Sequence, residues 1–183
     1  MLRNIKQKLD NSKGSSTLDL VIGFLIFIIL FSFLFDFFFI AYKQHQVSRL
    51  TTDITREIAI QSGLKLTTPT NYPGGAKNYI TTTEAYNTIA NYMSKIGVTD
   101  YKVTISLKDR NSSSSTRKTF VLTNNHTGYN TDYRGEISVT IEYNFKWGVW
   151  KSFVPGIKDG HRIVTRTAYG EYKHDYSSWK GES

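Results

Sequence analysis

Cysteine is absent from this sequence of 183 residues, which excludes a disulfide scaffold, a thiolate metal site and a cysteine nucleophile. The four histidines lack metal-ligand spacing, and the chain contains no phosphate-binding loop, dinucleotide fingerprint or nucleophile elbow. No pattern of residues therefore points to catalysis. We predict that the chain is not an enzyme, and we expect no metal and no cofactor.

Hydrophobic residues make up only 39% of the chain, but they are concentrated in one run near the N-terminus. The run from Leu20 to Phe39 is interrupted only by Ser32 and Asp36. As a helix it measures about 30 Å, the thickness of a bilayer core, so it predicts a membrane-spanning helix. It is too long for a secretory signal, and no small-residue cleavage site follows it.

The charges that flank this run predict its orientation. Residues 1–14 contain a single acid, Asp10, and their basic residues are Arg3, Lys6, Lys8 and Lys13. Because positive charge is retained inside, we expect a single-pass membrane protein with a cytoplasmic N-terminus. The polar remainder of the chain would then be extracytoplasmic.

The junction before the run resembles a class III, or prepilin, leader. Lys13 and Gly14 precede Ser15, and Asp19 is the fifth residue after the glycine. A glycine leaves the scissile carbonyl unobstructed, and an acid at the mouth of a membrane span is costly unless it is paired. The resemblance implies cleavage after Gly14 and pairing of Asp19 with a freed N-terminal amine. Alternatively, Lys13-Gly14 is a flexible linker and Asp19 is a first-turn acid favoured by the helix dipole.

Beyond the membrane run the apolar pattern continues as a single stripe. Val47, Leu50, Ile54 and Ile58 recur at spacings of three and four, as on one face of an amphipathic helix. No helix-breaking residue lies between Leu18 and Ser62, so we predict one continuous helix, with Gly63 as its C-terminal stop.

Within the run, Phe24, Phe31 and Phe38 are seven residues apart and share one face, a candidate subunit contact. Asp36 lies almost opposite, on the side of Ser32. Two interpretations of Asp36 remain open. It either points to water near the outer interface, or makes a subunit contact while bonded to Ser32 or to a basic group of a neighbour.

The C-terminal part predicts an α+β head. A helix is expected after Thr81-Thr82-Thr83-Glu84, ending at Gly97. Alternating β-branched and aromatic residues predict strands at 101–107, 118–123, 135–145 and 161–172, and 124–133 is expected to be a polar loop. Such elements form an antiparallel sheet on which the long helix packs.

Basic and aromatic residues are interleaved after the third strand. The basic residues considered as a polyanion-binding surface, for nucleic acid or a wall polymer, are Lys146, Lys151, Lys158 and Arg162. Alternatively, Trp147, Trp150 and Phe153 are core or subunit-interface residues with lysines around them.

Taken together, Lys13-Gly14, Asp19, the span to Tyr42 and the stretch 48–63 resemble the TadE-like minor pilins of tight-adherence machines, and related type IV pilin-like proteins of Gram-positive bacteria. The resemblance implies a leader at 1–14, a long helix at 15–63 and a head at 64–183. It also implies three kinds of partner: a prepilin peptidase, an assembly platform, and other pilin-like subunits. The alternative is an unprocessed single-pass protein whose outward head binds a partner, a wall polymer or DNA.

Overall fold

The computed structural model describes residues 2–70, 72–110 and 117–173, with the side chains of 2–15 excepted. The chain divides into two compact units. The first comprises Met1–Ala41 and Lys146–Asp159, and the second comprises Tyr42–Phe145 and Gly160–Ser183. The segment 146–159 thus groups with the N-terminal part of the long helix.

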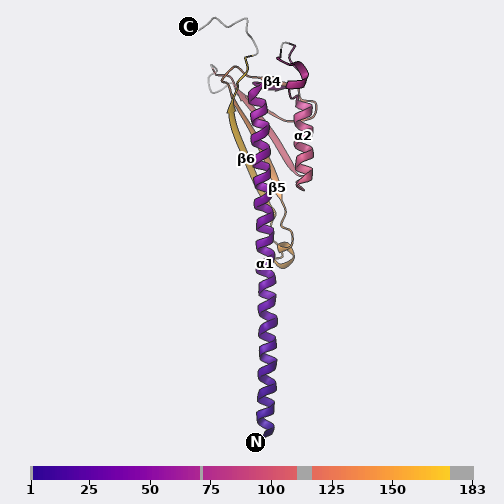
Figure 1. Ribbon diagram of the computed structural model, residues 1–183, viewed down its shortest axis with the longest axis vertical. Coiled ribbons are helices and arrows are strands. Elements are labelled where there is room, and N and C mark those ends of the chain that lie inside the picture. The colour runs from indigo at the N-terminus through magenta and orange to yellow at the C-terminus, as the bar shows by residue number, and fades with distance from the viewer. Residues whose placement is uncertain (1, 71, 111–116, 174–183) are drawn as a thin grey trace. The chain divides into compact units, whose positions relative to one another are not determined.

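Helix α1 (Leu2–Ile60) is one unbroken helix of 59 residues (Figure 1). At 1.5 Å per residue it is about 88 Å long. The predicted continuity is confirmed, although the helix also includes residues 2–14 and ends two residues before Ser62. Ser62 (φ 52°) and Gly63 (φ 146°) both leave the helical conformation. At Gly63 a Cβ atom would lie 2.6 Å from the Cα of Asn130, so only glycine permits this close approach.

The C-terminal part of α1 supplies one wall of the core of the second unit. The predicted stripe of Val47, Leu50, Ile54 and Ile58 is buried, as expected. Two buried threonines of this part of the helix satisfy their hydroxyls locally: Thr51 donates to the carbonyl of Val47, and Thr55 to that of Thr51.

The main sheet has four antiparallel strands in the order β3-β2-β5-β6. Their bounds are β2 Tyr101–Lys108, β3 Arg117–Val121, β5 Glu136–Phe145 and β6 Gly160–Tyr169. All four predicted strands are confirmed, within a few residues at their ends. Strand β2 shows why: Val103, Ile105 and Leu107 are buried and alternate with more exposed residues, which is the period of a half-buried strand. The fold is therefore α+β, as predicted.

Helix α2 (Thr82–Lys95) begins with a capping box in which the Thr81 hydroxyl accepts from the Glu84 amide and the Glu84 carboxylate accepts from the Thr81 amide. Tyr92 donates a hydrogen bond to Gln46 of α1, and Lys43 donates to the carbonyl of Gly97 at 3.3 Å. These bonds fix α2 beside the C-terminal part of α1, as Figure 1 shows.

Short elements complete the fold. Strands β1 (Gly63–Lys65) and β4 (Gly128–Asn130) pair antiparallel, which corrects the prediction that 124–133 is only a loop. The others are a 3₁₀ turn, η1 (Gly75–Asn78), and α3 (Trp150–Phe153). The Gln61 side chain ties the end of α1 to this region, because it donates to Gly63 and Ile80 carbonyls and accepts from the Ile80 amide.

Candidate membrane and assembly surface

Residues 18–39 of α1 expose their apolar side chains around most of the helix circumference. Phe24, Phe31 and Phe38, the predicted contact face, are all exposed. Among the described residues α1 is the one helix long and apolar enough to cross a membrane. An apolar surface of this length must be covered by lipid or by other protein.

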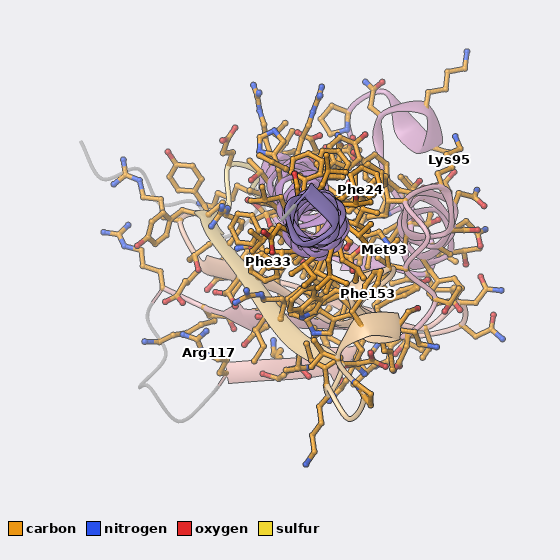
Figure 2. All side chains as sticks on the ribbon, turned by 90° about the horizontal axis from the view of Figure 1, so that it is seen from below. Phe24, Phe33, Met93, Lys95, Arg117 and Phe153 are labelled. Carbon is orange, nitrogen blue, oxygen red and sulfur yellow. The ribbon has the colours of Figure 1, made fainter. Side chains whose placement is uncertain are left out.

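The two sides of this helix differ in what covers them. Phe24 and Phe33 are nine residues, or about two and a half turns, apart, and Figure 2, viewed along α1, shows them on opposite sides. The side chain of Phe24 is exposed. The side of Phe33 is contacted by residues 146–159, which we call the Trp loop.

Aromatic contacts join the Trp loop to α1. The ring of Trp147 stacks on Phe33 with 6.4 Å between centroids, and Trp150 meets the same ring edge-on at 5.1 Å. The sequence left two alternatives for these tryptophans, and this packing agrees with the one in which they are core or interface residues. Phe153 lies in α3 and is 39% exposed.

Asp36 is the polar centre of the same contact. Its carboxylate accepts hydrogen bonds from the backbone amide of Trp150 at 2.7 Å and from that of Val149 at 3.2 Å. The loop approaches closely because residue 148 is glycine: a Cβ atom there would lie 2.8 Å from Asp36 Oδ1. Two amides directed at one carboxylate form charge-assisted bonds, which are about twice as strong as neutral ones.

This geometry contradicts one of the two open interpretations, that Asp36 points to water, since the residue is only 5% exposed. It also replaces the expected bond to Ser32, whose hydroxyl donates to the carbonyl of Ile28 at 2.6 Å. A signal for the burial was present in the sequence. Asp36 precedes Val47 by 11 residues, about three helical turns, and so lies on the side of α1 that carries the buried stripe.

The basic residues considered for polyanion binding are divided between the two units. Lys146, Lys151 and Lys158 are exposed on the Trp loop, where Lys151 forms an ion pair with Asp159 at 3.1 Å. Arg162 belongs to the second unit and lies over the ring of Phe145 at 5.7 Å. Polyanion binding stays a prediction.

The predicted processing residues Lys13, Gly14 and Ser15 lie within α1, but their side chains are outside the described part of the structure. Asp19 is exposed, and no hydrogen bond or ion pair joins it to another described residue. Its predicted role in assembly therefore rests on the sequence pattern.

Among the side chains described in 16–70, 72–110 and 117–173, no group of histidine, aspartate or glutamate could hold a metal ion. Comparisons with protein-family models, with curated proteins and with solved structures found no match. What the chain does must therefore be argued from its own helix, loop and charges.

Proposed function

We propose that the chain is a minor pilin-like, or pseudopilin-like, subunit that a prepilin peptidase processes and a type IV or Tad-like machine assembles. The observation that carries this proposal is α1 itself. One unbroken helix exposes apolar side chains over residues 18–39 and, in its C-terminal part, buries one apolar stripe in the core of the head.

The proposed mechanism is assembly rather than turnover. Residues 20–39 hold the subunit in the membrane, with the N-terminus in the cytoplasm and the head outside. After cleavage, the helix leaves the lipid and enters a bundle of equivalent helices. The face of Phe24, Phe31 and Phe38 then exchanges lipid contacts for protein contacts, with aromatic ridges rather than small residues at the interface.

Cleavage after Gly14 would leave the amine of Ser15 as a new positive charge close to Asp19. An unpaired carboxylate in the bundle would cost several kcal/mol, whereas a carboxylate paired with an amine would not. Pairing between subunits would therefore select one register of the bundle. The exposed position of Asp19 in the isolated subunit is compatible with such a contact.

Co-expression with a prepilin peptidase tests the proposal. The mature chain should begin at Ser15 by intact mass, and Gly14→Leu should block cleavage because the bulky side chain obstructs the scissile carbonyl. Gly23→Leu is the matched control, because nothing lies within 4 Å of a Cβ atom at Gly23. It should be cleaved like the parent.

A parent chain that keeps residues 1–14 in the presence of active peptidase would count against the pilin-like role. If that uncut chain is also monomeric in the membrane fraction, the alternative gains support. The protein would then be a single-pass anchor whose head binds a partner.

A further inference from the structure

We propose that the Trp loop binds the lipid headgroup interface of the leaflet at the C-terminal end of the span. This goes beyond assembly and rests only on the part of the proposed function in which α1 crosses a bilayer. The partner is a lipid surface with anionic headgroups. Depth, side-chain chemistry and backbone hydrogen bonding each support this assignment.

The depth follows from where the loop contacts α1. Trp147 and Trp150 pack on Phe33, and the Val149 and Trp150 amides bond to Asp36. Phe33 and Asp36 precede the end of the apolar run at Phe39 by six and three residues. At 1.5 Å per residue, the contact lies about 5–9 Å inside that end. A loop held there cannot avoid the interface when the run fills the bilayer core.

The side chains of the loop suit that position. Val149 is 47% exposed and Phe153 is 39% exposed, while both tryptophans are half-buried. Tryptophan is enriched at the membrane–water boundary because its ring is apolar and its N–H is polar. The exposed valine and phenylalanine provide apolar surface that can enter the acyl region.

The charge of the loop favours anionic lipid. Residues 146–159 contain three lysines and one aspartate, a net charge of +2 from three minus one. Lysines near the surface of an anionic membrane are attracted to its headgroups. Their long stems allow the ammonium groups to reach the headgroups while the aromatic residues stay deeper.

Lipid requires the polar groups of an irregular backbone to find partners within the protein, and several amides of the Trp loop do so. Asp36 accepts from the first two amides of the turn, and the Ser152 and Val154 amides bond to the carbonyls of Val149 and Trp150 at 3.0 and 3.1 Å. The same contact satisfies an acid that would otherwise face lipid.

Depth-dependent fluorescence quenching tests the proposal. The full chain carrying Trp179→Phe, whose remaining tryptophans are Trp147 and Trp150, is reconstituted in phosphatidylcholine–phosphatidylglycerol liposomes. Lipids brominated near the headgroup end of the acyl chain should reduce the emission by more than half, and aqueous iodide should have little effect. Quenching by iodide alone would overturn the proposal, because the loop would be in water. Quenching by neither would also overturn it, because another protein copy would cover the loop.

A matched pair of variants tests the apolar contact. Phe153→Ser should reduce bromolipid quenching by at least half, whereas Val121→Ser on β3, at a residue of similar exposure (42%), should leave it unchanged. Circular dichroism checks that both variants stay folded. Equal quenching in the two variants would contradict insertion of the loop. The liposomes contain no peptidase and no assembly machine, so failure here would leave the processing proposal untouched.

Discussion

Replacing Asp36 with leucine should release the Trp loop from α1. The carboxylate is 5% exposed and accepts from two backbone amides of the loop, those of Val149 and Trp150. Leucine removes both acceptor oxygens. It also removes the charge that makes the undocked state costly in lipid, so both effects shift the equilibrium toward the undocked loop.

The size of the effect can be worked from the two distances. A hydrogen bond to a charged group contributes about 1.5–3 kcal/mol. The bond to Trp150 is short at 2.7 Å, whereas that to Val149, at 3.2 Å, is at the long end of the normal range. We therefore expect a loss of about 2–4 kcal/mol for the pair. Because 1.4 kcal/mol is about a tenfold change, the undocked fraction should rise by about 30-fold to about 700-fold.

Amide hydrogen exchange of the chain in nanodiscs measures this fraction directly. In the Asp36→Leu variant, exchange at the Val149 and Trp150 amides should accelerate by the factor just derived, and trypsin should cleave faster after Lys151. Asp36→Asn retains one acceptor oxygen without the charge and should fall between the parent and the leucine variant.

Two controls isolate the contact. Asp53→Leu changes an exposed acid of the same helix, paired with Arg49 at 4.0 Å, and should leave exchange in the loop unchanged. Gly148→Ala keeps the carboxylate but places a Cβ atom 2.8 Å from it, so it should accelerate exchange, whereas Gly23→Ala should not. If both Asp36→Leu and Gly148→Ala exchanged like the parent, the bonds to Asp36 would contribute nothing to docking.

Three further outcomes are expected. Asp19→Ala should still be cleaved by the peptidase but should enter sheared filaments or pull-downs poorly, while Asp19→Glu should behave like the parent; equal incorporation of both would leave Asp19 a helix-start acid only. A cysteine introduced at the exposed Asn87 should react with an impermeant thiol reagent on intact cells, and one at Ser12 should not. The parent has no cysteine that could interfere. The opposite labelling pattern would show that the topology is the reverse of the one proposed. Burial raises the pKa of the Tyr79 phenol above its ordinary value, whereas the unfolded chain releases this proton near pH 10. The stability that Tyr79 contributes is therefore present below about pH 10 and is lost as the pH rises through the folded pKa, so Tyr79→Phe should flatten the alkaline loss of stability in denaturant titrations; parallel curves for the two proteins would refute this.

Local periodicity predicted the C-terminal part of α1 and the strands of the main sheet. The stripe consists of Val47, Leu50, Ile54 and Ile58, and the buried residues of β2 alternate along the strand. Each pattern is long enough to establish its period from the sequence. Strands β1 and β4 have only three residues each, too few to establish a period. They exist because the backbones at Gly63 and Gly128 approach their partners closely, a property of the assembled structure rather than of either segment.

The Trp loop could not be derived in the same way, because its contact with α1 joins residues more than a hundred positions apart in the sequence. Asp36 and Val149 are separated by 113 residues. The local sequence showed an acid in an apolar run and, separately, a cluster of aromatic residues with lysines. It did not show that these two segments contact each other. The position of Asp36 on the side of Val47 indicated that it is covered. It could not indicate which segment covers it.

The two acids within residues 18–42 of α1 therefore differ in how their charge is compensated. Asp36 is satisfied by its own chain, because amides of the Trp loop bond to it in the isolated subunit. Asp19 is exposed, with no hydrogen bond or ion pair to another described residue. An acid whose partner is built into the fold gains nothing from a neighbouring subunit, whereas an acid at the mouth of the span with no such partner does. In the proposed assembly, Asp19 is thus the acid that can pair with an amine of the next subunit, whereas Asp36 bonds to the loop of its own chain.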